Sequence, residues 1–143
     1  MDLRWGKGVP KDGEYEDEGT WIWVSMATEC RLVLSHIVGE RSQRSADRLV
    51  KRTAQCLKVL PLFVTDGLKF YKIALLRQYG KLQRFARTGK RGRPRLPRLI
   101  SDQLLKYAQI IKQRAGHILT RVEKRVIFGE NIDPKMISTS CIE

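Results

Sequence analysis

Acidic residues are scarce through the middle of this chain. Of its 15 Asp and Glu residues, four lie between Arg41 and Phe128, and the same interval carries most of the 28 Lys and Arg residues. The formal net charge is +13 and the isoelectric point is near 10.1. A field of this sign attracts phosphate backbones without any specific contact. The composition therefore favours a polyanion as partner and makes the middle and later chain the expected nucleic-acid face.

Cysteine, histidine and long apolar runs are also scarce. The three cysteines, Cys30, Cys56 and Cys141, have no Cys-x-x-Cys spacing, and His36 and His117 stand apart from them in the sequence. The pattern indicates neither a disulfide framework nor a zinc site. No run approaches the roughly 20 apolar residues that span a bilayer, and the N-terminus has no signal-peptide core. We therefore expect no membrane partner and a cytoplasmic protein.

The first half of the chain changes from strand-like to helix-like patterning at Ser42. Two β-rich runs, Trp21–Met26 and Arg31–Val38, flank a short polar turn. If the first residues of the chain pair with them, the three strands form an antiparallel meander. Beyond Ser42, a natural N-cap, apolar residues recur at helical spacing as far as Leu57, which predicts an amphipathic helix.

The stretch around Asp66 has the pattern of a strand that ends in a carboxylate. A short apolar run, Leu62–Val64, stops at Asp66 and Gly67, and a helical pattern follows over Leu68–Tyr79. Ligands and metals bind at this edge of open α/β sheets, and Gly67 allows a sharp turn. A purely structural Asp-Gly turn would give the same local pattern. Gly80 is expected to be the C′ residue of the helix.

A densely basic stretch, Lys81–Arg98, is broken by glycine and proline and predicts a loop. Its centre, Gly-Lys-Arg-Gly-Arg-Pro-Arg at 89–95, resembles an AT-hook, an extended motif that enters the minor groove of A·T-rich DNA. The alternative is a flexible basic loop that contacts phosphates non-specifically. Both interpretations place the same side chains on DNA: Lys90, Arg91, Arg93, Arg95 and Arg98.

A second basic surface is expected on the polar side of the helix that follows Ser42. A stripe of cations along one helix face can contact successive phosphates. A solvated helix face is the other explanation of the same pattern. The stripe consists of Arg44, Arg48, Lys51 and Arg52.

The last third of the chain predicts a β-hairpin followed by a short strand. Residues Tyr107–Phe128 alternate between apolar and polar in their second half, so we expect a hairpin that turns at 115–117. Met136–Ser138 is expected to form a last short strand. Thr139 or Ser140 would then cap a helix that begins as the chain ends.

This order of elements is that of an RNase H-like fold. The 143 residues, 42% of them hydrophobic, suffice for one domain with a real core and leave no room for a second. We therefore expect an α/β domain over residues 1–143, with a mixed sheet of three antiparallel strands followed by strand-helix units. The basic loop and the β-hairpin form an insertion at about residues 81–135.

Several short stretches resemble the DDE transposases of the insertion-sequence-one family. Together they run through nearly the whole chain, and their order matches the order in the family. The resemblance implies an enzyme that cuts DNA at the ends of an insertion sequence and joins the 3′-hydroxyl to target DNA. The stretches are Met-Asp-Leu-Arg-Trp-Gly at 1–6, Trp-Ile-Trp-Val at 21–24, Gly-Glu-Arg-Ser at 39–42, Thr-Asp-Gly at 65–67 and Ile-Ser-Thr-Ser-Cys-Ile-Glu at 137–143.

Carried over residue by residue, the resemblance makes Asp2, Asp66 and Glu143 the catalytic, metal-binding carboxylates. Such hard oxygen ligands hold two Mg²⁺ (or Mn²⁺) ions about 4 Å apart for in-line attack on a phosphodiester. In the family the residue after the first Asp is usually acidic, whereas Leu3 stands at that position here. Many relatives also place an Asp in the turn that Ala27 occupies. If Ala27 stands at the true catalytic position, this copy lacks a carboxylate and is inactive.

Family members also carry an N-terminal DNA-binding region and a helix after the last Glu, whereas this chain starts and ends at the two outer acids. The resemblance therefore implies a truncated or degenerate copy with weak or no activity alone. It also implies transposon ends and target DNA as partners, a homodimer as the assembly and a nucleoid-associated protein of a prokaryote. The alternative is a non-catalytic basic DNA-binding protein that uses the AT-hook-like segment.

Overall fold

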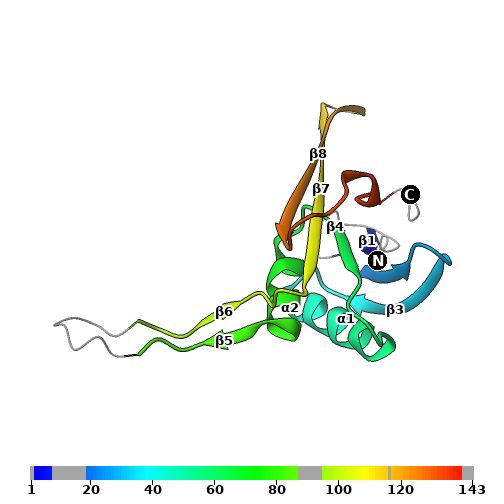
Figure 1. Cartoon of the computed structure of the whole chain (residues 1–143). Coiled ribbons are helices and arrows are strands. Elements are labelled where there is room, and N and C mark those ends of the chain that lie inside the picture. The colour runs from blue at the N-terminus through cyan, green and yellow to red at the C-terminus, as the bar shows by residue number, and fades with distance from the viewer. Residues whose placement is uncertain (1, 8–18, 87–94, 116, 140–143) are drawn as a thin grey trace.

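In the residues that the structure describes, a six-stranded mixed sheet carries two α-helices on one face (Figure 1). The computed structural model describes residues 2–7, 19–86, 95–115 and 117–139. The elements follow one another as β1 (Asp2–Lys7), β2 (Trp21–Ala27), β3 (Leu32–Gly39), α1 (Gln43–Cys56), β4 (Leu62–Asp66), α2 (Lys69–Tyr79), β5 (Lys81–Gln83), β6 (Arg98–Ile100), β7 (Lys106–Ala115), β8 (Ile118–Phe128) and the short 3-10 helix η1 (Pro134–Met136).

The strands of the main sheet lie in the order β3-β2-β1-β4-β7-β8. β1, β2 and β3 pair antiparallel, β4 and β7 run parallel to β1, and β8 pairs antiparallel with β7. The predicted antiparallel meander and the predicted hairpin are both confirmed, and so is the mixed α/β class. Because parallel strands need crossover connections, α1 and α2 link β3 to β4 and β4 to β7.

The helix α1 begins where the sequence places its cap. The Ser42 side chain accepts a hydrogen bond from the backbone N–H of Ser45, which satisfies one of the free donors of the first turn. The apolar stripe then turns toward the sheet, so that Ala46, Leu49 and Val50 are buried. The period of the apolar residues therefore fixes which side of α1 packs and which side stays in solvent.

The core between the helices and the sheet is largely aromatic. Trp23, Phe63, Tyr71 and Tyr107 are fully buried, and they come from β2, β4, α2 and β7. The rings of Trp23 and Tyr71 meet edge to face, with centroids 5.7 Å apart. These residues join four elements in one cluster, so the position of α2 on the sheet depends on them.

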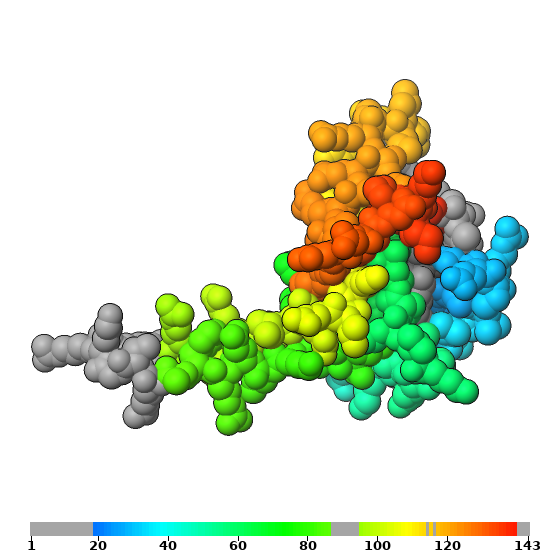
Figure 2. Space-filling model, in the orientation of Figure 1, coloured from blue at the N-terminus to red at the C-terminus, as the bar shows by residue number. Residues whose placement is uncertain are grey.

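A smaller apolar cluster covers the opposite face of the sheet. Val64 of β4 and Ala108 and Ile110 of β7 pack there against Ile137 from the last part of the chain. Figure 2 shows this part of the chain lying across the β7–β8 hairpin. Alternate residues of β4 and β7 thus serve the two faces, as the two-residue period of a strand requires.

The basic stretch predicted as a loop begins and ends as strands. β5 and β6 form a two-stranded ribbon in which Leu82 pairs with Leu99, and the ribbon projects from the body (Figures 1 and 2). An ion pair of 2.8 Å between Lys81 and Asp102 joins its two ends. The loop prediction is therefore wrong at these ends, while residues 87–94, the greater part of the AT-hook-like segment, lie outside the described residues.

The short strand predicted at Met136–Ser138 is also wrong. The 3-10 helix η1 ends at Met136, and the residues up to Thr139 form no strand. Asp133 explains the difference, because its side chain accepts from the Lys135 N–H and caps a turn whose first residue is Pro134. Ser140, a predicted helix cap, lies outside the described residues.

Gly80 ends α2, although not in the left-handed conformation expected of a C′ glycine. Its backbone is extended, with φ −77° and ψ 157°, and its N–H donates to the Leu76 carbonyl at 2.8 Å. A Cβ at this position would overlap the Leu76 carbonyl oxygen and lie 3.0 Å from the Ile100 oxygen. Close approach of two backbone segments, not the sign of φ, is therefore the reason for glycine here.

Within the described part of the chain, neither helix has the length and apolar character needed to cross a lipid bilayer.

We predict that Gly80→Ala destabilises the fold by about 1–3 kcal/mol, since α2 or β6 must shift to admit the methyl group. Urea denaturation measures the change in the free energy of unfolding. Gly19→Ala is the matched control, because a Cβ at Gly19 meets nothing within 4 Å. Equal stability of the two variants would contradict the close approach at Gly80.

Candidate functional site

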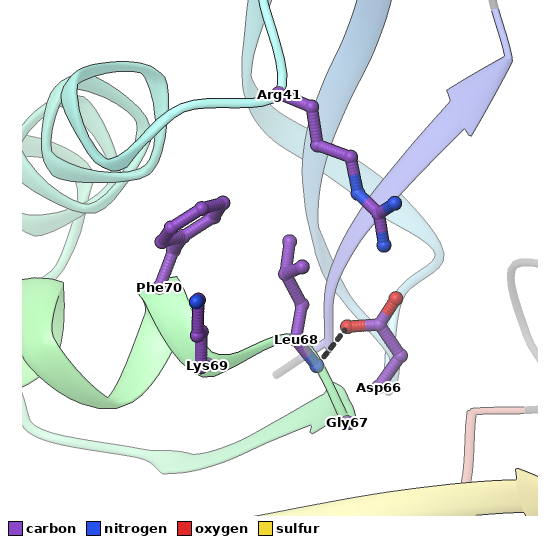
Figure 3. Close-up of a pocket in the computed structure, with 6 residues that line it drawn as sticks. All are labelled: Arg41, Asp66, Gly67, Leu68, Lys69 and Phe70. Atoms are coloured by element: carbon purple, nitrogen blue, oxygen red, sulfur yellow. Dashed lines mark hydrogen bonds between the residues drawn. The ribbon is translucent and has the colours of Figure 1, made fainter. Parts of the chain in front are cut away.

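Asp66 is the last residue of β4 and opens the turn into α2. Its Oδ1 accepts a hydrogen bond from the backbone N–H of Leu68 at 3.2 Å (Figure 3). Gly67 makes this turn possible at close quarters, because a Cβ there would lie 3.3 Å from the Ile111 side chain. The carboxylate is therefore held at the end of the strand, as the sequence pattern predicted, by its own backbone turn.

A buried chain of hydrogen bonds supports this turn from beneath. Gln109 Nε2 donates to the Tyr107 hydroxyl at 2.7 Å, and the Tyr107 and Thr65 hydroxyls lie 2.9 Å apart. Thr65 Oγ1 donates to the Asp66 carbonyl at 2.8 Å. Since a threonine hydroxyl has one proton, Tyr107 must be the donor to Thr65. The chain thus runs in one direction, from β7 to the residue that carries the carboxylate.

The same chain of hydrogen bonds also reaches Leu68, the N-cap residue of α2. Gln109 Nε2 also lies 3.5 Å from the Leu68 carbonyl oxygen, which makes this a weak second contact. Thr65, Tyr107 and Gln109 are each at most 8% exposed. Water therefore has little access to the chain, and loss of one partner would leave buried polar groups unsatisfied.

Two buried tyrosines lie within the electrostatic influence of Asp66. Burial raises the pKa of Tyr107 to about 12, against the lowering effect of its hydrogen bonds with Thr65 and Gln109, and the charge of Asp66 adds to the increase. Burial, followed by the charges of Asp66 and Tyr107, raises the pKa of Tyr71 well above 10. Both phenols therefore stay neutral near neutral pH, and Tyr107 keeps the proton that it donates to Thr65.

An open cavity of about 570 Å³ lies above Asp66. Its lining combines the carboxylate with two cations and an aromatic ring, namely Arg41, Lys69 and Phe70, together with Gly67 and Leu68 (Figure 3). The Arg41 side chain comes from the connection between β3 and α1 and points toward the Asp66 carboxylate (Figure 3). Its guanidinium also lies over the Trp21 ring, 5.6 Å from the centroid. The cavity can therefore receive an anionic group beside a carboxylate.

The backbone of Asp2 lies on the strand next to Asp66. β1 and β4 pair in parallel, with Asp2 opposite Val64, two residues before Asp66. Standard strand spacings put the two Cα atoms about 8 Å apart. The sheet thus brings two of the three predicted catalytic positions to neighbouring strands, although 64 residues separate them in sequence.

Ala27, the alternative early position, lies farther from Asp66. It is the last residue of β2 and pairs with Leu32 of β3, and β1 lies between β2 and β4. Of the two early positions, Asp2 is therefore the one on a strand that borders β4. This geometry supports Asp2 as the partner of Asp66.

Glu143, the third predicted carboxylate, lies outside the described residues. Among the residues that are described, no three His, Cys, Asp or Glu side chains gather at one point. Asp66 is the carboxylate that lines the cavity, and its hard oxygen atoms suit Mg²⁺ or Mn²⁺. Asp66 is one such ligand, and the predicted others are Asp2 and Glu143.

The predicted DNA-binding residues lie on two separate elements. Four of them occupy the exposed side of α1, where Arg52 also donates to the His36 carbonyl oxygen at 3.2 Å. Arg98 lies in β6 and Arg95 just before it, with its guanidinium 5.8 Å from the Phe85 ring centroid. The α1 residues are Arg44, Arg48, Lys51 and Arg52, and the remaining three, Lys90, Arg91 and Arg93, lie outside the described residues.

Sequence reasoning missed the residues that support and surround Asp66. Tyr107 and Gln109 alternate on β7 in a way that places them on one face, yet nothing local shows that this face meets Thr65. Arg41 stands directly before the Ser42 cap, inside one of the stretches that resemble the transposase family. That position is the one signal that could have identified it.

We predict that Tyr107→Phe lowers the free energy of unfolding by about 1–3 kcal/mol, because Gln109 and Thr65 each lose a buried partner. The change is measured by urea denaturation at pH 7. Tyr79→Phe is the control, since Tyr79 is half-buried and packs its ring on Phe63 without needing a hydroxyl partner. A loss no larger than that of the control would show that the hydrogen-bond chain adds nothing to stability.

The raised pKa of Tyr107 also predicts an alkaline loss of stability. The unfolded chain releases this proton near pH 10, whereas the folded chain keeps it to about pH 12. The contribution is therefore complete below pH 10 and is lost as the pH rises to 12, by on the order of 2 kcal/mol. Unfolding of the wild type and of Tyr107→Phe, compared from pH 9 to pH 12, measures it. The variant should show the shallower decline, and parallel curves would contradict the assignment.

Comparison with known proteins adds no assignment to this geometry. No protein-family model matches the chain, and no curated protein and no solved structure matches it. What the chain does is therefore inferred from its own residues.

Proposed function

We propose that this chain is the catalytic core of a DDE-type transposase with an RNase H-like fold, which cuts and joins DNA strands at insertion-sequence ends. One observation carries the proposal: β1 pairs in parallel with β4, so that the backbone of Asp2 lies beside the strand that ends in Asp66. In-line attack on a phosphodiester needs carboxylates brought together from distant parts of the chain. This sheet brings the backbones of two of the three candidates to neighbouring strands.

The arrangement of the sheet supports the same proposal. Three antiparallel strands come first, and β4 and β7 are then added on the open side of β1, parallel to it, each after a helix. This is the order and direction of strands expected of an RNase H-like sheet. The β5–β6 ribbon lies between these common elements and β8 after them, whereas β7, which the predicted insertion at about residues 81–135 included, is a strand of the main sheet.

Asp2, Asp66 and Glu143 would hold the Mg²⁺ or Mn²⁺ ions. When bound, two such ions activate a water or a 3′-hydroxyl and stabilise the leaving oxygen. The chain itself supplies position and charge: the hydrogen bonds from Tyr107 and Thr65 hold the backbone of Asp66 in place. Arg41 and Lys69 offer positive charge to the phosphates at the rim of the cavity.

The alternative function is DNA binding without catalysis. The exposed cations of α1, together with Arg98 at the outer end of β6 and Arg95 beyond it, favour it, because they need no carboxylate to bind phosphate. Both functions predict a strong salt dependence of DNA binding. The two functions differ in the role of Asp66, which holds a metal ion only in the catalytic one.

We therefore predict that Mn²⁺ binds at Asp66 and that Asp66→Asn abolishes this binding. Paramagnetic broadening of the backbone amide signals of Gly67 and Leu68 by Mn²⁺ measures it without any need for activity. Asp102→Asn is the control, because Asp102 pairs with Lys81 at the base of the ribbon, beyond the opposite end of β4. The control should broaden like the wild type.

DNA affinity of the same variants completes the test. If Asp66→Asn loses Mn²⁺ binding and keeps its affinity for duplex DNA, the carboxylate belongs to a metal site in a DNA-binding protein. Broadening that is absent in the wild type, or unchanged in Asp66→Asn, would refute the transposase core and leave the non-catalytic function.

A further inference from the structure

Two lysines of the β7–β8 hairpin lie on the same stretch of sheet as Asp66. The strand registers place Asp66 opposite Ile110, and Ile110 opposite Lys124. Lys112 follows two residues farther along β7, opposite Val122. With neighbouring strands about 4.8 Å apart, the backbone of Lys124 is roughly 10 Å from that of Asp66. One extended polymeric ligand that passes over Asp66 can therefore reach both lysines.

The two lysines share a notch with the last part of the chain. The notch has a volume of about 150 Å³, and Lys112, Lys124, Ser138 and Thr139 line it above Ile110 and Ile137. These two isoleucines are 5% and 2% exposed, so the floor is part of the packed core. The notch therefore offers ammonium and hydroxyl groups on a rigid apolar base.

Lys124 is also the residue that holds this part of the chain on the hairpin. Its Nζ donates to the Pro134 carbonyl oxygen at 2.7 Å. An ammonium group has three donors, so this bond leaves further donors that can reach a ligand. The single bond also orients the side chain, which lowers the entropy lost when a ligand binds.

Two acidic groups near the notch have partners of their own. Glu123 pairs with Arg125 at 2.8 Å, and the hydrogen bond and charge of Arg125 lower the pKa of its carboxyl. Asp133 accepts from the Lys135 N–H. Of the side chains that the structure describes, none that lines the notch is acidic. The notch is therefore complementary to a ligand with negative charge.

We propose that Lys112 and Lys124 bind consecutive phosphodiester groups of the DNA strand whose reacting phosphate lies at Asp66, an inference that rests on the proposed function. The notch would then fix the direction in which the strand leaves the carboxylate, across β7 and β8. The Ser138 hydroxyl, which lines the same notch, can donate to the phosphate oxygens. An extended polyanion fits this row better than a compact anion, because the cations continue from one strand to the next.

The hairpin provides its own control. Arg121 and Arg125 belong to β8 as Lys124 does, but the odd-numbered positions of the strand alternate with those that line the notch. The double variant Arg121→Gln/Arg125→Gln therefore removes two positive charges from the same hairpin without changing the notch. The test variant is Lys112→Gln/Lys124→Gln.

Binding of a fluorescently labelled DNA duplex is measured by anisotropy over a range of salt concentrations, in EDTA so that no metal site is needed. The slope of log affinity against log salt should fall by about two for the lysine variant, one for each lost phosphate contact, and by less than one for the arginine control. Lys112→Arg/Lys124→Arg keeps the charge and should restore the slope. Thermal unfolding of the variants shows whether loss of the Lys124 bond to Pro134 disturbs the fold. The single variant Lys112→Gln tests the notch without breaking that bond, and it should lower the slope by about one.

Equal losses of slope in the lysine and arginine variants would overturn the inference, because they would show a response to total charge alone. Tighter binding of an RNA duplex than of the matched DNA duplex would overturn it as well. Failure of the proposed function appears in a different measurement, the Mn²⁺ broadening at Gly67 and Leu68, so the two failures are distinguishable.

Discussion

The hydrogen bonds that run from Gln109 through Tyr107 and Thr65 to the Asp66 carbonyl are the constraint on which the site depends. They join β7 to β4 inside the core, and they end on the residue that carries the candidate carboxylate. Because the direction of these hydrogen bonds is fixed, the turn cannot rotate without leaving a buried group unpaired. The aromatic core around them then fixes α2, which begins two residues after the turn.

The local features of the fold were predictable from the sequence. The Ser42 cap and the apolar period gave α1, and the apolar run that stops at Asp66 gave β4, because both depend on neighbouring residues alone. The position of Asp66 at a strand end followed from the same pattern. The mixed α/β class followed from the order of elements, which is a property of the whole chain.

Other features depend on contacts between distant residues, and the sequence pattern did not show them. The hydroxyl groups of Thr65 and Tyr107 meet across 42 positions. Gly80 is needed beside the carbonyls of Leu76 and Ile100, and Ile100 belongs to the far side of the ribbon. The charge and polarity of the Lys81–Arg98 stretch predicted a loop, whereas the residues at its two ends pair with each other as the short strands β5 and β6. Tertiary context overrides composition at such places.

The outermost strand of the sheet, β8, has one side of its backbone without a neighbouring strand in the described structure. Open edges of this kind invite a second copy of a protein to add its own strand, and long, flat, uncharged ones aggregate. Here Arg121, Lys124 and Arg125 lie along the edge, so two such edges repel each other. The charge that attracts a polyanion therefore has a second effect: it disfavours the pairing of two copies along this strand.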